Sequence, residues 1–511
     1  MSQRWLRILF RRRIMVFFLL ALQIGILVFV VSTSSKKIDL INRISTITSC
    51  FVVLYIISKN DKSSYKLIWV ILILVFPVFG GLFYLLFNFQ SSTTKVRKTI
   101  EKIKFESQSL FVPKENILTK IANENEEVFP LVKYLQGCAG FPVYQNTQTE
   151  YLTPGELMFE RLTEELKKAE RYIFLEYFII QEGIMWNTVL EILKEKAKQG
   201  VDVRVIYDDM GCFFLLPKDY QKTLESMGIH CFVFNAFQPI MSTIQNNRDH
   251  RKIAVIDGKT AFTGGINLAD EYINAIDKHG YWKDASIMVH GDAAWSFTLM
   301  FLQMWSLCKN TIENYNKYRP RQTETCPVLS DGYVQPYADS PIDNENVGEH
   351  VYLKIINNAK KYVYINTPYL IIDDTMVSAL KLSAKSGVDV RIVTPHRWDK
   401  RFVHMTTRSY YRELLRAGVK IYEYSRGFMH SKTFVSDDKV ATVGTTNLDF
   451  RSLYLHFECG VLLYKNRSVM EIKKDYLNTI NACQEITMKD CGHNAFMRFI
   501  QEILRIFAPL M

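Results

Sequence analysis

Two stretches of the chain share one pattern: Asp249-His250-Arg251-Lys252-Ile253-Ala254-Val255-Ile256-Asp257-Gly258, and His430-Ser431-Lys432-Thr433-Phe434-Val435-Ser436-Asp437. Position 430 lies 180 residues after position 250, and both copies read His-x-Lys-x-x-x-x-Asp. Small residues and an asparagine follow each copy at the same distance, with Asn267 in the first and Asn447 in the second. A single match would be weak evidence, but a repeat in one register indicates a duplicated unit.

The residue types predict phosphate chemistry if each apolar run is a strand. Residues two apart on a strand leave the same face, so His250 would lie beside Lys252, and His430 beside Lys432. An imidazole can attack or transfer a proton near neutral pH, and an ammonium can neutralise a phosphate oxygen. Two such faces and the two asparagine amides would surround one phosphate. We therefore predict a phosphoryl-transfer site that needs no metal.

The aspartates of the two motifs have a second interpretation. Ile256-Asp257-Gly258-Lys259 stands before another apolar run, which is typical of a hairpin turn. We place Asp257 and Asp437 in the catalytic motif but expect them to hold it together rather than to touch substrate. Gly264, Gly265 and Gly444 would fit strand ends, but the asparagine that follows them in both copies favours a shared polar site.

The rest of the chain repeats in the same way. A strand over residues 172–180, a helix over 189–198 that ends at Gly200, and a strand over 201–207 predict a βαβ unit with a parallel sheet. Residues 362–366 match residues 172–176 at an offset of 190. The first copy carries about ten extra residues before His250, including the apolar residues 237–241, which fit either a lid or membrane-dipping loop or an ordinary surface loop. We predict an α/β fold of two tandem domains with pseudo-twofold symmetry, whose motif strands meet where the domains join.

The motifs resemble the paired HKD signatures of the phospholipase D superfamily, and their context resembles its bacterial cardiolipin synthase branch. The resemblance covers nearly the whole chain and is carried by Leu175-Glu176-Tyr177-Phe178, Gly200-Val201-Asp202-Val203-Arg204-Val205, Tyr207-Asp208, Trp282-Lys283-Asp284, Asp449-Phe450-Arg451-Ser452 and Phe457-Glu458. Two residues depart from the family pattern. His456 stands where the family usually has asparagine, and Gly265 stands where many members have serine.

The resemblance implies roles for the site residues. Asp284 and Glu458 would orient the two imidazoles, and Lys252, Lys432, Asn267 and Asn447 would hold the phosphate oxygens. His250 would attack phosphatidylglycerol to form a phosphatidyl-histidine, and His430 would protonate the departing glycerol and then activate a second phosphatidylglycerol. The products would be cardiolipin and glycerol, with no cofactor and no metal. The signature of metal-dependent phosphatidyltransferases that use a CDP-activated lipid does not occur in the sequence.

Three other functions are compatible with parts of the sequence. A membrane phospholipase D that makes phosphatidic acid would use the same residues with water as acceptor. A nuclease of the superfamily would need a nucleic-acid groove and has no use for membrane spans, so we expect no nucleic-acid partner. A non-catalytic membrane scaffold would not need both motifs intact.

The N-terminus predicts a bacterial membrane protein with two or three transmembrane helices. Hydrophobic residues make up 48% of the chain and the formal charge is +11, which favours an anionic membrane surface. The apolar runs are residues 14–31, which also resemble a signal peptide, residues 44–57, which are short, and residues 67–87. Flanking Lys and Arg residues divide evenly between the two sides in a three-span topology. They separate better in a two-span topology with both ends cytoplasmic, so the side that carries the active site stays open.

The domain organisation follows from these patterns. We expect a membrane anchor over residues 1–90, a linker over 91–135, phospholipase D-like domains over 136–325 and 326–490, and a C-terminal amphipathic helix over 491–511. That helix would either lie on a bilayer or cap the second domain. The nine cysteines are scattered without metal-ligand spacing, which favours free thiols over a disulfide framework.

Overall fold

The computed structural model describes residues 36–60, 62–76, 80–81, 84–85, 91–112, 115–236, 243–320, 331–343, 345–492 and 495–510. The chain divides into two compact units, one of residues 1–94 with 237–246 and one of residues 95–236 with 247–511. The predicted span over residues 14–31 and the extra residues 237–241 lie outside the described residues.

The first unit contains the helices α3 (Lys36–Ser58) and α4 (Ser63–Val75). They pack through Val52 and Ile56 of α3 and Ile73 of α4, together with Tyr84. Other apolar side chains of both helices are exposed, for example Phe51 at 67% and Leu74 at 69%. No helix in the described part of the chain has both the length and the apolar character that a bilayer crossing needs. The transmembrane helices predicted for residues 1–90 are therefore not confirmed.

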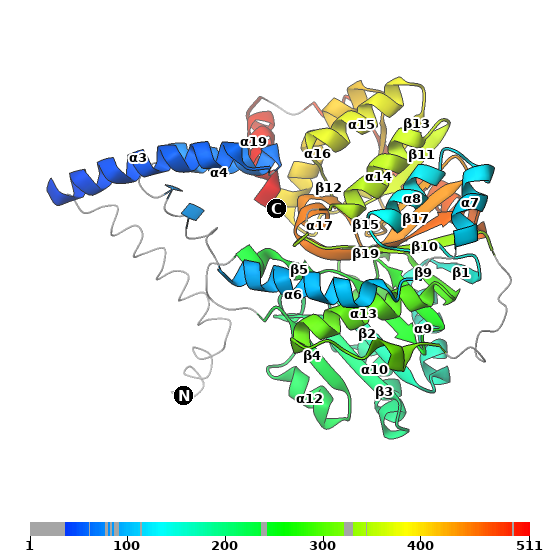
Figure 1. The fold of residues 1–511 in the computed structure, drawn as a ribbon. Coiled ribbons are helices and arrows are strands. Elements are labelled where there is room, and N and C mark those ends of the chain that lie inside the picture. Colours follow the sequence, from blue (N-terminus) through cyan, green and yellow to red (C-terminus); the bar gives the residue numbers. More distant parts are fainter. Residues whose placement is uncertain are drawn as a thin grey trace, which may run out of the picture. The chain divides into compact units, whose positions relative to one another are not determined.

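The second unit contains two similar sheets (Figure 1). The strands of the first, in spatial order, are β1 (Thr147–Leu152), β9 (Ser286–Gly291), β7 (Thr260–Gly264), β6 (Lys252–Ile256), β2 (Tyr172–Tyr177), β3 (Asp202–Asp208) and β4 (His230–Phe234). Those of the second are β10 (Tyr333–Asp339), β19 (His456–Tyr464), β17 (Val440–Gly444), β16 (Thr433–Ser436), β11 (Tyr362–Asn366), β13 (Asp389–Pro395), β14 (Lys420–Tyr424) and β20 (Cys483–Ile486).

The two sheets repeat one topology, apart from the added edge strand β20. In each sheet three consecutive parallel strands are followed by two antiparallel strands that carry the motif and its hairpin partner. The motif strands β6 and β16 occupy the same central place, next to β2 and β11 respectively. This confirms the prediction of two tandem α/β domains.

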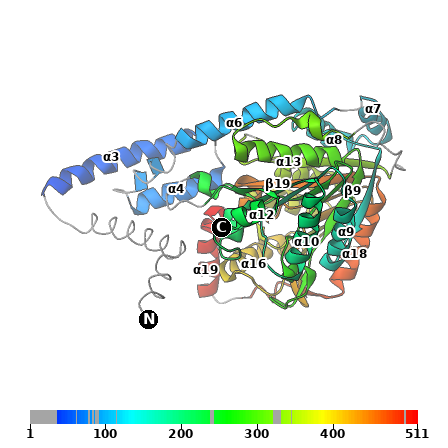
Figure 2. The same cartoon turned by 90° about the horizontal axis from the view of Figure 1, so that it is seen from below.

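Helices cover both faces of the first sheet. Helices α9 (Gly155–Lys168) and α10 (Ile184–Lys198) lie side by side over one face (Figure 2), and α13 (Ala294–Lys309) covers the other. Ile173 of β2 belongs to the buried cluster that includes residues of α9 and α10. The next residue, Phe174, stacks on Phe301 of α13 with ring centroids 4.5 Å apart. Burial on both faces explains why the strands are continuously apolar instead of alternating.

The two domains share one core. Ala261 and Ile287 of the first sheet belong to the same buried cluster as Val443 and Val461 of the second. Burial of apolar side chains is the main force that holds such a join together. A continuous core fixes the two motif strands relative to each other.

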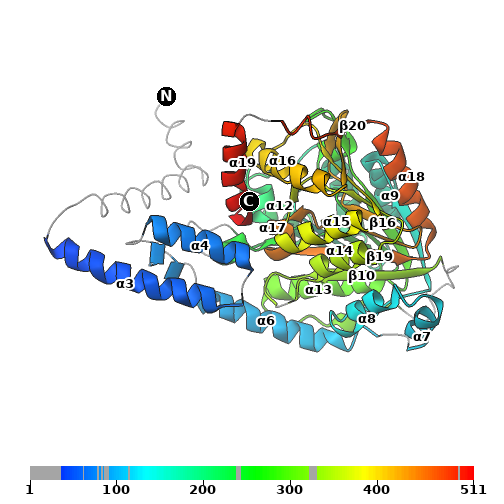
Figure 3. The same cartoon turned by 90° about the horizontal axis from the view of Figure 1, so that it is seen from above.

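Further helices pack on this unit. In the predicted linker, α6 (Ser91–Gln108) is joined to α13 by a hydrogen bond of 2.7 Å from Gln303 to the Ser107 hydroxyl, and α7 (Glu115–Glu124) and α8 (Phe129–Gly137) follow. At the other end of the chain, α19 (Ala495–Ile506) lies beside α16 (Arg401–Arg416) of the second domain (Figure 3).

Candidate active site

Each motif histidine is held by backbone of the opposite domain. The His250 N–H donates to the Phe457 carbonyl at 3.0 Å, and the His430 N–H donates to the Lys283 carbonyl at 2.8 Å. Short parallel pairings stand beside these bonds: β5 (Arg248–Asp249) pairs with β19, and β15 (Gly427–Met429) pairs with β8 (Tyr281–Lys283). This reciprocal exchange brings the two motifs to one place.

The carboxylates that contact the imidazoles are also exchanged between the domains. Nδ1 of His250 lies 2.8 Å from Oε1 of Glu458, and Nδ1 of His430 lies 2.6 Å from Oδ2 of Asp284. Both carboxylates are completely buried. A hydrogen bond at Nδ1 sets the tautomer and leaves Nε2 of His250 for chemistry, while Nε2 of His430 lies 3.2 Å from Nζ of Lys432.

Burial makes both histidines neutral in the free protein. It lowers the pKa of His250 to about 3 and that of His430 to about 4, against the opposing effect of the neighbouring carboxylates. Burial by itself would raise the pKa of Glu458, but the His250 partner holds it well below its usual range. At neutral pH the site therefore combines an ionised carboxylate with an imidazole whose Nε2 lone pair is available.

The two lysines share the site with the histidines. Nζ of Lys252 donates to the His250 carbonyl at 2.6 Å, and Nζ of Lys432 lies 2.9 Å from Nδ1 of His430. Burial lowers the pKa of Lys252 to about 8 and that of Lys432 to about 7. The charge of Lys252 also lowers the pKa of Lys432, as expected for two ammoniums that lie near each other.

The two asparagines differ in their contacts. Asn267 accepts from the Ile179 N–H at 3.0 Å and donates to the Tyr272 hydroxyl at 2.7 Å, so its amide already has partners. Among the described residues the buried Oδ1 of Asn447 has no hydrogen-bond partner. A buried amide oxygen without a partner is uncommon and indicates a polar ligand or water nearby.

Asp257 and Asp437 lie at the opposite ends of the motif strands from the histidines. The Asp257 carboxylate accepts from the N–H groups of Glu170, Arg171 and Tyr172 at 2.8–2.9 Å. Asp437 does the same for residues 360–362 at 2.7–2.9 Å. Both aspartates have left-handed backbone, with φ of 53° and 54°, as a tight turn between strands requires. The two aspartates therefore hold neighbouring backbone in place and do not contact the histidines.

Two further residues, Thr445 and Gly265, help to position the carboxylates of Glu458 and Asp284. The sequence alone did not predict this role. The Thr445 hydroxyl donates a short hydrogen bond to Oε2 of Glu458. At the matching place in the first domain, a Cβ on Gly265 would lie 2.1 Å from Oδ1 of Asp284. The glycine thus lets Asp284 occupy the space that a serine side chain would take. The repeat of small residues after each motif was the available signal.

A family model described as cardiolipin synthase, PLD-like domain, matches residues 162–288 and 352–480. These two copies make up half of the chain and each contains one motif histidine. The chain belongs to this family. A second model, described as the N-terminal region of phospholipase D-nuclease proteins, matches residues 47–87.

Relatives of the cardiolipin synthase family match almost the whole chain. A cardiolipin synthase of Alkalihalophilus pseudofirmus is 36% identical over 490 residues, which cover 93% of this chain and 95% of the relative. A cardiolipin synthase of Halalkalibacterium halodurans is 35% identical, covering 91% and 93%. An uncharacterized protein of Streptococcus mutans is 43% identical, covering 90% and 99%.

A solved structure has the same fold. The phosphatidylserine synthase of Haemophilus influenzae aligns with a TM-score of 0.56 at 17% identity, covering 72% of this chain and 94% of that one. At this identity the likeness speaks for the fold alone.

His456 is a third imidazole in this cardiolipin synthase site. Its ring lies 5.5 Å from the His250 ring between centroids, and its Nδ1 is 3.8 Å from Oε1 of Glu458. Neither ring nitrogen has a hydrogen-bond partner among the described residues. His250, His456 and Glu458 place three ligand atoms within 4.8 Å of one another, a set that suits a divalent transition metal. A metal there would occupy the residues that the family resemblance assigns to catalysis.

The family stretch at Glu176 supports the loop that carries His250. Arg251 lies between two buried acids, with Nε 2.6 Å from Glu176 and 3.4 Å from Asp249. All three side chains are buried, and burial raises the pKa of Glu176 well above its usual range. A buried guanidinium needs such partners, so these residues form one unit with the motif.

Proposed function

We propose that the protein is a cardiolipin synthase that transfers a phosphatidyl group from one phosphatidylglycerol to the hydroxyl of another. The observation that carries the proposal is the pair of buried imidazoles, each oriented by a carboxylate of the opposite domain. Membership of the cardiolipin synthase family supports the choice of lipid substrates.

In the proposed first step, Nε2 of His250 attacks the phosphorus of phosphatidylglycerol. An N–P bond forms, the bond from phosphorus to the glycerol oxygen breaks, and His430 gives that oxygen its proton. His430 is neutral in the free protein. The negative phosphodiester raises its pKa on binding, so that the ring can carry the proton that it donates.

In the proposed second step, neutral His430 takes the proton from the hydroxyl of a second phosphatidylglycerol. The hydroxyl oxygen bonds to phosphorus, the N–P bond breaks, and His250 returns to its neutral form. Lys252 and Lys432 hold the equatorial oxygens, where negative charge accumulates, together with the NH₂ group of the Asn447 amide. One phosphodiester replaces another, so the exchange needs no nucleotide.

We place the protein at the bacterial cell membrane through residues 1–90. The exposed apolar side chains of α3 and α4 and the match of residues 47–87 to a phospholipase D-nuclease N-terminal model support this placement. Alkaline extraction of membranes tests it, since a protein held only by charge is released into the supernatant.

Product analysis tests the reaction. Detergent-purified full-length protein is incubated with phosphatidylglycerol as the only phospholipid. We expect cardiolipin and glycerol in equal amounts, and none from a His250→Ala variant. Phosphatidic acid as the main product would instead show a phospholipase D that uses water.

A further inference from the structure

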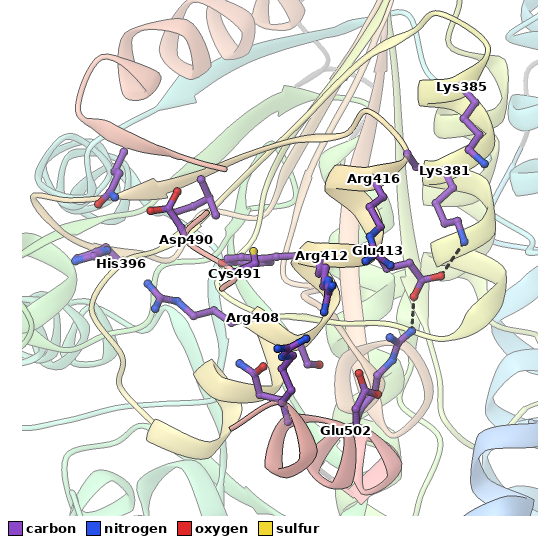
Figure 4. Close-up of a pocket in the computed structure, with 18 residues that line it drawn as sticks. Lys381, Lys385, His396, Arg408, Arg412, Glu413, Arg416, Asp490, Cys491 and Glu502 are labelled. Atoms are coloured by element: carbon purple, nitrogen blue, oxygen red, sulfur yellow. Dashed lines mark hydrogen bonds and ion pairs between the residues drawn. The ribbon is translucent and has the colours of Figure 1, made fainter. Parts of the chain in front are cut away.

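A basic cavity lies in the second domain away from the two motifs. It has a volume of about 690 Å³ and is lined by α15 (Asp374–Lys385), α16, β20 and α19 (Figure 4). Seven lysine or arginine side chains line it, against three aspartate or glutamate side chains. None of the motif residues, orienting carboxylates or asparagines of the active site is among the lining residues.

The cations are arranged in stripes that face the cavity. Arg408, Arg412 and Arg416 are spaced four apart on α16, and Lys381 and Lys385 are spaced four apart on α15. Residues at this spacing lie on one side of a helix. Figure 4 shows these side chains around one opening.

The carboxylates neutralise only part of this charge. Glu413 forms ion pairs with Lys381 at 2.7 Å and with Arg505 at 2.8 Å. The buried Glu423 forms an ion pair with Arg408. Within the described residues, neither Arg412 nor Arg416 forms an ion pair. Cations without acidic partners around a cavity of this volume suit a phosphate group.

Helix α19 adds an apolar surface next to the cations. Arg505 turns inward, with its guanidinium 4.4 Å from the Tyr410 ring, and Gln501 is buried. On the outward side Phe496 and Phe499 are 68% and 63% exposed, and Ile503 and Ile506 continue the stripe. An exposed apolar stripe beside basic residues is the pattern of a helix that lies at a membrane surface. The helix therefore caps the second domain and also presents an apolar face.

We propose that this cavity binds the phosphate headgroup of an anionic glycerophospholipid, whose acyl chains run along the outward face of α19. The lipid is bound and not converted, so the site holds the catalytic unit to an anionic bilayer independently of the His250 reaction. The cations select a headgroup with net negative charge, and the apolar stripe distinguishes a lipid from a free anion.

Hydrogen exchange of the full-length protein tests this site. The His250→Ala variant in neutral detergent is titrated separately with dihexanoyl-phosphatidylglycerol, dihexanoyl-phosphatidylcholine and inorganic phosphate. We expect phosphatidylglycerol to protect backbone amides of both α16 and α19, and phosphatidylcholine to protect neither. Inorganic phosphate should protect α16 weakly and leave α19 unchanged.

Variants in the same background separate the two parts of the site. Arg412→Gln with Arg416→Gln should weaken the phosphatidylglycerol effect about 30-fold, since each cation near an anionic lipid contributes about 1 kcal/mol. Phe499→Gln should remove protection of α19 and keep the phosphate effect on α16. The control, Lys194→Gln with Lys198→Gln, removes two charges at the same spacing on α10 and should change nothing.

Equal protection by both lipids, full protection by inorganic phosphate, or an unchanged response of the Arg412 and Arg416 variant would each overturn the proposal. Exchange of peptides around β16 reports whether a variant is folded. Because the His250→Ala background makes no product, the outcome does not depend on whether the proposed synthase reaction is correct.

Discussion

The exchange of carboxylates between the domains predicts that a mutation in the second domain disables the histidine of the first. Glu458 is completely buried, lies 2.8 Å from Nδ1 of His250 and also accepts the Thr445 hydroxyl. Glu458→Gln keeps the shape but removes the charge. Loss of a hydrogen bond to a charged group costs about 1.5–3 kcal/mol, or roughly 10- to 150-fold in rate.

The tautomer adds to this loss. A glutamine that presents its NH₂ group to Nδ1 would move the imidazole proton to Nε2, where the lone pair must attack. We therefore expect attack by His250 to slow by about 10² to 10⁴. Asp284→Asn acts on His430 instead, because Asp284 contacts that ring at 2.6 Å.

A substrate that needs no acid separates the two effects. With phosphatidyl-p-nitrophenol the leaving group departs without a proton, and its absorbance follows formation of the phosphatidyl-enzyme. Asp284→Asn should keep a fast burst, release product slowly to the acceptor and accumulate an adduct on His250. Glu458→Gln should lose the burst, and Glu165→Gln, a change on the outer helix α9, should behave as wild type.

Two results would refute this reasoning. If Asp284→Asn lost the burst and Glu458→Gln kept it, His430 would be the nucleophile. If the two variants were affected equally, the carboxylates would not act on separate histidines.

Three other predictions concern pH, metal and stability. The value of kcat/KM should fall as pH rises through about 7 to 8, because Lys432 and Lys252 lose the protons that make them phosphate ligands. In a pH profile of kcat/KM, Lys432→Arg should move the alkaline limb to higher pH. An alkaline limb that does not move would contradict the assignment. Zn²⁺ should inhibit the enzyme by binding His250, His456 and Glu458. His456→Asn removes one ligand and should raise the inhibitory Zn²⁺ concentration about tenfold or more in a titration. Equal inhibition of the variant and the wild type would exclude this site. Asp257→Ala removes the acceptor of three backbone hydrogen bonds, so the free energy of unfolding in denaturant should fall by roughly 3 kcal/mol. A loss of kcat with an unchanged free energy of unfolding would instead show that Asp257 acts directly in catalysis.

The duplicated pattern in the sequence predicted the fold because strand order follows from repeated elements. The offsets between the two copies pointed to two α/β domains, and the equivalent central places of β6 and β16 agree with this. Residue types in the motifs also indicated the chemistry, since an imidazole and an ammonium close together suit a phosphate site. The expected place on a strand was wrong for three of the four residues, because His250, His430 and Lys432 precede β6 and β16.

The partner of each imidazole was not predictable. Asp284 follows His250 in the chain, and Glu458 follows His430, so sequence distance favours pairing within each domain. The exchange depends on the pairings of β5 with β19 and β8 with β15, which join segments far apart in sequence. The contact of Gly265 with Asp284 depends on the same packing.

The C-terminal helix shows another limit of pattern reasoning. Helical spacing indicated an apolar stripe but left open whether it packs inward or faces outward. In the structure, Gln501 and Arg505 make the inward contacts, and Phe496 and Phe499 stay exposed. Which side is covered depends on the neighbouring α16 and its charges.

The stereochemistry at phosphorus tests the central claim most directly. That claim is that one phosphate is passed from alcohol to His250 and from His250 to a second alcohol. Each displacement inverts phosphorus, so phosphatidylglycerol made chiral at phosphorus with oxygen isotopes and sulfur should give cardiolipin with net retention. Net inversion would mean a single direct displacement, and the account of paired imidazoles would be wrong.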